Sequence, residues 1–415
     1  MLSRASSRPA WIVVAAALLL ISLETALRLG ANSPDTRFTL PQFSLGYFWD
    51  TPIGWTNVID GVAVNRDAVQ FSSLAGFFRG LSVPVPPQDN VYVRFSGYSL
   101  LGSALAPLVG TYTSFVVANV LLWLGGALAT YVLAVRKTGA RSVGVVAAVL
   151  VSTAPAFAAL AGQPLPYVGS YALFALGLLL FDQVRLFERD ISLRTAALAG
   201  LAAGTSLLFY DLYMLPAFVI VYGLLRRMPL RTLALVLVMM ALPRVVWSGY
   251  WQLMHLPSYS HNEQHPIEAL LAWLDADRVG SGLHMIQGYA ALAGHGLLNM
   301  GAIFMFWPLV VAAWELWYRR RTAEAGWFAA VAIAGFGPAL FMLSTWPHLP
   351  RWYAYAFPAV YILAAAAARR LGWRAGIGLV VAPSIALANL DLLGMTRLME
   401  LLLFQPAEWS YLWSP

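Results

Sequence analysis

Two arginines lie at the ends of long apolar stretches, a position suited to contact with a lipid phosphate. Arg351 directly precedes the apolar stretch 352–368, and Arg244 lies near the end of the stretch 232–250. A guanidinium can bind a phosphate through two parallel hydrogen bonds. We therefore predict that Arg351 first, and Arg244 second, bind a phosphate. The alternatives are a helix-end anchor for Arg351 and pairing with a carboxylate during folding for Arg244.

Two carboxylates and one imidazole are the candidates for proton transfer and for further polar contacts. Asp67 lies on an amphipathic stretch, where partial desolvation would raise its pKa toward that of a general base. Asp211 lies between two apolar stretches, and it either acts in the site or caps the following helix. His348, three residues before Arg351, either assists binding or is structural. For Asp67 the alternative is an ordinary solvated carboxylate.

The sequence carries no clear metal motif. It contains no cysteine, which excludes thiolate zinc sites and iron–sulfur clusters. His261 and His265 would share one face of a helix, but Pro266 prevents a normal helix interior and the spacing is not HExxH. The sequence therefore identifies no cofactor with certainty, and a divalent metal is left as an open alternative.

The composition is that of a protein whose surface faces lipid. Of 415 residues, 60% are hydrophobic and 11% are charged, whereas roughly a quarter are charged in soluble domains. The net charge of +7 does not indicate a nucleic-acid partner, because the basic residues gather at the ends of apolar stretches instead of forming a continuous stripe. A Gly-rich loop that would bind a nucleotide is also missing.

Eleven apolar stretches predict an all-α, polytopic membrane protein with a single transmembrane domain over residues 1–415. About 20 residues are needed to cross a bilayer, and the candidates are 11–28, 112–135, 142–162, 165–184, 195–210, 212–225, 232–250, 297–318, 325–345, 352–368 and 375–394. With a cytoplasmic N-terminus and a retained signal anchor, every cytoplasmic loop is positive, as the positive-inside rule requires. We expect a bacterial inner-membrane protein whose chemistry takes place on the extracytoplasmic face.

Two expected outer loops, 29–111 and 251–296, are longer than simple connections need to be. Within the first loop, the spacing of apolar residues predicts an interfacial amphipathic helix from Val62 to Gly80. The apolar stretch from Gly97 to Gly110 would be only about 21 Å long as a helix, against ~30 Å for the hydrocarbon core, so it should be re-entrant or interfacial. The second loop contains one short amphipathic stretch from Ile267 to Asp275.

Several short motifs occur in an order that resembles the lipid-linked-sugar glycosyltransferases of the GT-C fold. That family includes the protein O-mannosyltransferases and the aminoarabinose transferase of lipid A. The resemblance is good over residues 10–185 and looser afterwards. The matching segments are Asp67-Ala68-Val69-Gln70-Phe71, Gly97-Tyr98-Ser99-Leu100-Leu101, Leu108-Val109-Gly110, Arg136-Lys137, Ala154-Pro155 and His348-Leu349-Pro350-Arg351-Trp352-Tyr353 with Pro358.

The resemblance implies roles for particular residues. It implies a polyprenyl-phosphate-sugar donor, an outward-facing cavity roofed by the first outer loop, and Asp67 as the acid at the reacting centre. It also implies that Arg66 and Tyr98 contact the acceptor or the sugar. Many relatives carry an adjacent acidic pair where this chain has Arg66-Asp67, so Asp211 is the candidate for a second acid.

The resulting prediction is a membrane glycosyltransferase. It would move a sugar from a polyprenyl-phosphate donor to an envelope glycan, lipid or protein, with inversion implied by the resemblance. One alternative is a non-catalytic GT-C-like subunit. The other is a secondary transporter or flippase, which would favour polar groups near the membrane midplane.

Overall fold

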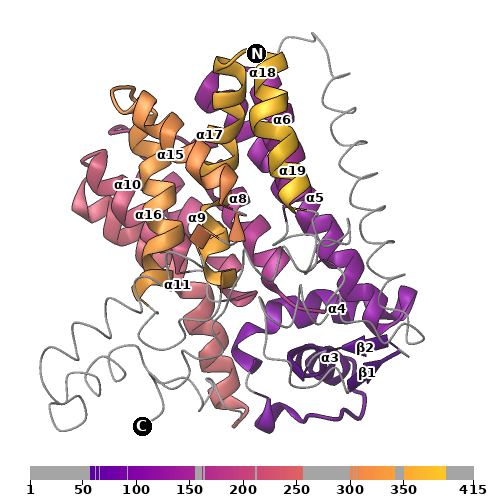
Figure 1. Cartoon of the computed structure of the whole chain (residues 1–415). Helices are drawn as coiled ribbons and strands as arrows, with labels where there is room; N and C mark the ends of the chain where they lie inside the picture. Colours follow the sequence, from indigo (N-terminus) through magenta and orange to yellow (C-terminus); the bar gives the residue numbers. More distant parts are fainter. Residues whose placement is uncertain are drawn as a thin grey trace, which may run out of the picture.

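The computed structural model of the chain is built almost entirely of helices (Figure 1). It describes residues 57–60, 62–64, 66–90, 92–154, 161, 164–210, 213–255, 300–301, 303–304, 306–341 and 350–388. The expected first span, most of the second outer loop, Asp211 and His348 lie outside these residues. The side chains of Arg66, Asp67 and Arg351 lie outside them as well.

The first described segment is a small antiparallel hairpin. Strands β1 (Asn57–Ile59) and β2 (Val62–Val64) pair with Asn57 opposite Val64. The helical prediction from Val62 to Gly80 is therefore wrong over its first residues, where alternating valines favour a strand. The helix α3 begins only at Arg66 and ends at Phe78.

Asp60, in the turn of the hairpin, joins the hairpin to the start of a long helix. Its Oδ2 accepts a hydrogen bond of 2.8 Å from the backbone N–H of Tyr112. That N–H lies in the first turn of α5, where no backbone acceptor within the helix is available. The hairpin thus supplies a cap to α5.

The rest of the described part of the expected outer loop is mostly helical. After α3 come the short 3₁₀ helices η2 (Pro87–Asp89) and η3 (Val93–Phe95), and then α4 (Ser96–Val109). Helix α4 coincides with the short helix expected over 97–110. It packs against α3 and α5, below the main bundle in Figure 1.

Two described helices are long and apolar enough to cross a membrane unaided. They are α5 (Thr111–Thr138) and α11 (Leu230–Leu253). Helix α5 lies between two glycines with positive φ, Gly110 at 85° and Gly139 at 68°, of which Gly139 forms the common left-handed helix terminus.

The remaining helices overlap the expected apolar stretches but are shorter than a membrane crossing. The number of about eleven crossings stays a prediction, because only α5 and α11 among the described helices reach spanning length by themselves. The shorter elements are α6 (Arg141–Ser152), α8 (Tyr167–Gln183), α9 (Leu193–Gly204), η4 (Thr205–Leu208), α10 (Met214–Leu225), α15 (Trp307–Arg319), α16 (Ala325–Phe341), η6 (Pro350–Ala356), α17 (Phe357–Arg370), α18 (Trp373–Gly376), the π-turn η7 (Ile377–Val381) and α19 (Ala382–Ala388).

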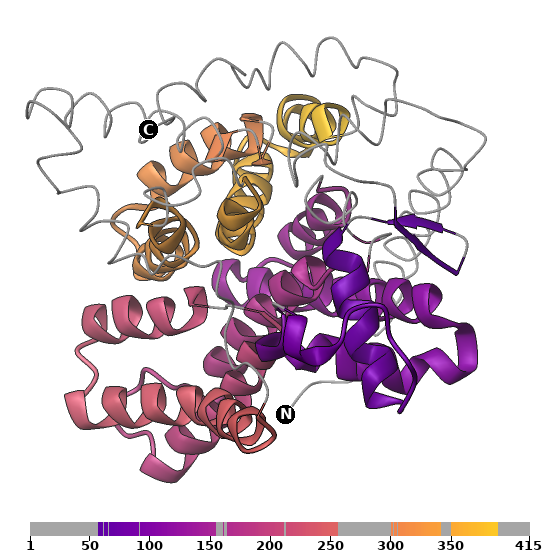
Figure 2. The ribbon, with the colours of Figure 1, turned by 90° about the horizontal axis from the view of Figure 1, so that it is seen from below.

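Helix α17 is the most deeply buried helix of the described chain. Its residues from Phe357 to Ala368 are all buried, and it packs against α6 and α15. Its alanine-rich sequence allows such close contact, because small side chains let neighbouring helix backbones approach. Figure 2 shows α17 and α15, in yellow and orange, beside each other in a view from below.

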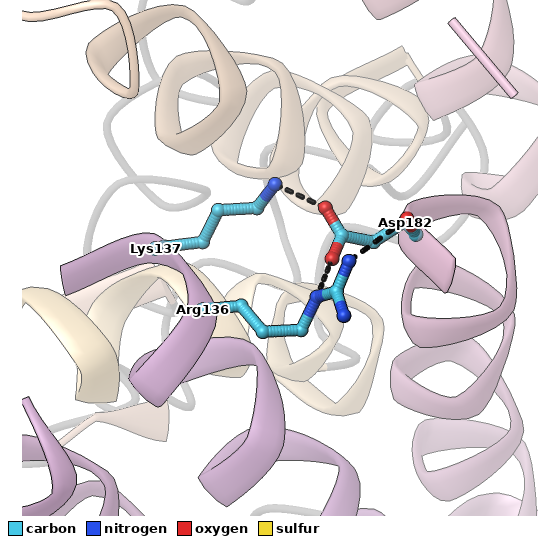
Figure 3. A network of polar contacts seen from close by, with 3 residues as sticks. All are labelled: Arg136, Lys137 and Asp182. Atoms are coloured by element: carbon cyan, nitrogen blue, oxygen red, sulfur yellow. Dashed lines mark hydrogen bonds and ion pairs between the residues drawn. The ribbon is translucent and has the colours of Figure 1, made fainter. Parts of the chain in front are cut away.

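A charge network joins three helices at the end of the bundle opposite α3 and α4. Arg136 and Lys137, in the last turn of α5, both bind the carboxylate of Asp182 on α8 (Figure 3). Arg136 also donates a 3.2 Å hydrogen bond to the Asp182 carbonyl. The ammonium of Lys137 lies 5.1 Å from the ring centre of Trp327 on α16. The positive charges at the end of α5 therefore hold neighbouring helices together.

Candidate functional site

The position of Arg244 follows from the close packing of α9 against α11. A Cβ atom on Gly200 would lie 2.7 Å from the Val236 carbonyl oxygen, and one on Gly204 would lie 2.2 Å from that of Met240. Only glycine permits this contact, which is the small-xxx-small packing typical of membrane helices. From the first contact to the second, the chain moves four residues toward the C-terminus in both helices, from Gly200 to Gly204 and from Val236 to Met240. The two helices therefore run parallel. Arg244 then lies one helical turn beyond Met240.

Arg244 is half-buried and is fixed by two contacts. Its Nη1 donates a 3.1 Å hydrogen bond to the carbonyl of Leu207 in η4. Its guanidinium carbon lies 4.8 Å from the ring centre of Phe95 in η3, within the range of a cation–π interaction. The contacts join α11 to two segments distant in sequence. The spacing of Gly200 and Gly204 is the sequence signal from which this close packing could be predicted.

Five aromatic rings, here called the aromatic cluster, connect Arg244 to other parts of the site. The ring of Phe95 lies 6.3 Å from Tyr92 and 5.0 Å from Tyr210. Tyr92 stacks on Phe71 of α3 at 4.6 Å, and Tyr210 meets Tyr167 of α8 edge to face at 5.2 Å. Such pairs stabilise the packing beyond the area they bury. The cluster consists of Phe71, Tyr92, Phe95, Tyr167 and Tyr210.

Helix α3, which carries Arg66 and Asp67 as its first two residues, is held by hydrogen bonds to its backbone. Asn90 Nδ2 donates to the Gln70 carbonyl at 2.7 Å, and Ser99 Oγ of α4 donates to the Phe71 carbonyl at 3.0 Å. These bonds attach the middle of α3 to both η2 and α4.

The segment that contains Arg351 joins the same region through α8. Arg351 is the second residue of η6. Four residues later, the Tyr355 hydroxyl hydrogen-bonds to Ser170 Oγ at 2.7 Å, and its ring meets Tyr171 edge to face at 4.9 Å. Ser170 lies one helical turn after Tyr167, so η6 is attached to α8 next to the aromatic cluster.

Tyr98 lies inside the protein in this structure. Its ring packs 4.8 Å from Phe115 of α5 and 5.6 Å from Phe71 of α3, and its side chain is fully buried. Burial raises the pKa of Tyr98 well above its ordinary value, so the hydroxyl stays neutral. The predicted contact of Tyr98 with a sugar or an acceptor stays a prediction.

The segments that carry the predicted residues meet at one end of the bundle. The aromatic cluster joins α3, whose first residues are Arg66 and Asp67, to η3 and α8, and it includes Tyr210, which directly precedes Asp211. That the reacting groups lie close together stays a prediction. Asp211, His348 and the side chains of Asp67 and Arg351 lie outside the described residues. Within those residues, no three His, Asp or Glu side chains are grouped to hold a metal ion.

Comparison with known proteins finds a match at the level of the fold. No protein-family model matches the sequence, and no curated protein matches it. Two crystal structures of ArnT from Cupriavidus metallidurans do match. The one bound to undecaprenyl phosphate has a TM-score of 0.58 at 18% identity, and the apo structure has a TM-score of 0.53 at 17% identity.

Each alignment covers 95% of this chain and 64% of the ArnT chain. The chain thus spans slightly less than two thirds of the length of ArnT, and it shares the ArnT fold over almost its whole length. The resemblance to the GT-C fold that the sequence motifs indicate is confirmed.

Proposed function

We propose that the protein is a membrane glycosyltransferase that uses a polyprenyl-phosphate-linked sugar. The observation that carries the proposal is the fold shared with ArnT, which was solved with undecaprenyl phosphate bound. The meeting of α3, η6 and α11 at or beside the aromatic cluster supports it, because these segments carry the predicted base and the predicted phosphate ligands. The acceptor would be a hydroxyl of an envelope glycan, lipid or protein on the extracytoplasmic face.

The proposed reaction forms one bond and breaks another at the anomeric carbon of the donor sugar. The acceptor oxygen attacks this carbon, the bond from the carbon to the phosphate oxygen breaks, and polyprenyl phosphate leaves. Asp67 takes the proton of the acceptor hydroxyl as general base. Arg351 and Arg244, assisted by His348, stabilise the negative charge that develops on the leaving phosphate. Inversion at the anomeric carbon follows from this single displacement.

Three further residues complete the proposed site. Asp211, directly after Tyr210 of the aromatic cluster, is the second acid that the Arg66-Asp67 sequence lacks. Arg66 lies beside Asp67 at the start of α3, where a positive side chain suits contact with an acceptor or a sugar oxygen. Tyr98 takes part only if α3 and α4 separate when substrate binds, because its ring is now covered by Phe71.

The first prediction concerns Asp67→Asn. Purified full-length protein is given a set of polyprenyl phosphates with labelled sugars, and label transfer and released polyprenyl phosphate are both measured. Removal of a general base lowers rates by about 10²–10⁴-fold, so we expect a loss of at least about 100-fold with unchanged donor binding.

The matched control is Asp89→Asn, which removes an exposed carboxylate in η2 of the same loop and should leave turnover unchanged. Full turnover by Asp67→Asn would show that another group is the base. If the wild-type protein binds polyprenyl phosphate but transfers none of the sugars, the non-catalytic alternative replaces the enzyme.

A further inference from the structure

A buried carboxylate joins the ends of α15 and α17. Glu315 is fully buried, and its two oxygens bind two different arginines. Arg319 Nε donates to Oε1 at 2.6 Å from the last turn of α15, and Arg370 Nε donates to Oε2 at 2.8 Å from the last residue of α17. These three side chains are here called the Glu315 cluster.

The Glu315 cluster carries more positive than negative charge. One carboxylate neutralises one of the two guanidiniums, and the side chains of Arg319 and Arg370 remain 24% and 26% exposed. The exposed residues Arg320, Arg321 and Arg369 add further positive charge next to it. A compact group of arginines at the ends of membrane helices attracts anionic lipid head groups, each basic residue contributing about 1 kcal/mol.

Aromatic rings hold these guanidiniums in fixed positions. The Arg370 guanidinium carbon lies 4.0 Å from the ring centre of Trp314 and 4.1 Å from that of Tyr318. Arg320 lies 4.3 Å above Trp317 and donates a 2.9 Å hydrogen bond to its carbonyl. Stacking keeps an arginine ordered before an anion arrives, which lowers the entropy lost on binding.

An exposed apolar face of α15 leads to this arginine group. Val310, Trp314 and Trp317 are 57%, 44% and 67% exposed, and their spacing places them on one side of the helix. Acyl chains could lie along this face while the head group reaches Arg320. Exposed tryptophan and tyrosine at a helix end are typical of the depth at which lipid head groups lie.

We propose that the Glu315 cluster, Arg320 and the apolar face of α15 bind one anionic phospholipid through its phosphodiester. The site is separate from the proposed donor site, because α15 and α17 end at the end of the bundle opposite α3 and α4 (Figure 1). A phospholipid fits better than a soluble anion, since the basic group continues directly into an exposed apolar face.

The test measures lipid binding to purified full-length protein by native mass spectrometry. Phosphatidylglycerol and phosphatidylcholine are titrated separately. We expect phosphatidylglycerol to bind more tightly, and Arg320→Gln to weaken it about fivefold, the factor for one basic residue lost near an anionic surface. The control is Arg194→Gln, an exposed arginine of α9, which should leave the affinity unchanged.

A second variant is expected to raise the affinity for phosphatidylglycerol. Glu315→Gln removes the neutralising carboxylate, so phosphatidylglycerol should bind about fivefold more tightly. The thermal unfolding midpoint of each variant shows whether it is folded, and Arg320→Gln, at an exposed position, decides the matter if Glu315→Gln does not fold. Equal affinity for the two lipids, or unchanged affinity in Arg320→Gln, would overturn the proposal. Displacement of phosphatidylglycerol by millimolar inorganic phosphate would also overturn it, because the site would then take a free anion.

Discussion

Arg244 shows how a single charged residue can be kept in place near a membrane. A guanidinium in an apolar setting is costly unless it is paired or faces water. The carbonyl of Leu207 and the ring of Phe95 each stabilise it from a different element. One guanidinium reaches both partners at once, because it has several N–H donors at its edge and a flat face that can lie over a ring. A lysine ammonium is more compact and should hold this pair of contacts less well.

The second prediction concerns donor binding by the two proposed phosphate ligands, Arg351 and Arg244. Hydrogen bonds to charged groups contribute about 1.5–3 kcal/mol, so we expect Arg351→Ala and Arg244→Ala each to raise the dissociation constant for polyprenyl phosphate at least about tenfold. Arg244→Lys should restore only part of the affinity. Binding is measured by titration of polyprenyl phosphate, and unfolding is followed separately. An affinity unchanged in Arg351→Ala would identify that residue as a helix-end anchor.

At the scale of the element, the glycines of α9 decide where α11 lies. A methyl group on Gly204 would meet the backbone oxygen of Met240 at 2.2 Å, and a backbone atom cannot rotate away as a side chain can. The two helices would have to move apart. Since Arg244 lies one turn further along α11, its contact with η4 would be lost at the same time.

The third prediction compares two glycine-to-alanine substitutions. Gly204→Ala should destabilise the protein by about 1–3 kcal/mol, the cost of overpacking. It should also weaken donor binding, because Arg244 would lose its contact with η4. A Cβ atom on Gly249, which lies in α11, meets no atom within 4 Å, so Gly249→Ala should be neutral or stabilise the helix by up to about 1 kcal/mol. Thermal unfolding in detergent provides the comparison. Equal midpoints for the two variants would contradict the close packing of α9 and α11.

The elements also show what the sequence alone could predict. Hydropathy predicts α5 closely, as 112–135 against Thr111–Thr138, because a long apolar helix needs only local signals. The stretch Val62–Val64 was predicted as helix because alternating and helical spacing cannot be told apart over three residues. The contact of Arg244 with Phe95 was not foreseeable, since it depends on how α11 packs against segments remote in sequence. The site residues were named from motifs, while their meeting point is set by tertiary packing.

At the scale of the whole molecule, the charged groups separate toward the two ends of the bundle. Arg136, Lys137 and Asp182 join helices at one end (Figure 3), and the Glu315 cluster lies at the ends of α15 and α17. The segments carrying the proposed catalytic residues lie at the other end, with α3 and α4. This separation agrees with a membrane protein whose arginine-rich end faces the cytoplasm.

The fourth prediction tests this orientation. The chain contains no cysteine, so one introduced cysteine is the only thiol in the protein and reports its side of the membrane without background. Asp89 in η2 and Arg189 after α8 are both exposed. The reactivity of a cysteine at either position therefore reports whether the reagent reaches that side of the membrane, and not whether the residue is buried.

We expect a membrane-impermeant maleimide to label Asp89→Cys in intact spheroplasts and Arg189→Cys only after permeabilisation. Both variants should react fully once solubilised, which serves as the control. Labelling in the reverse order would place α3 and Asp67 on the cytoplasmic side. An extracytoplasmic acceptor would then be unable to reach the proposed base.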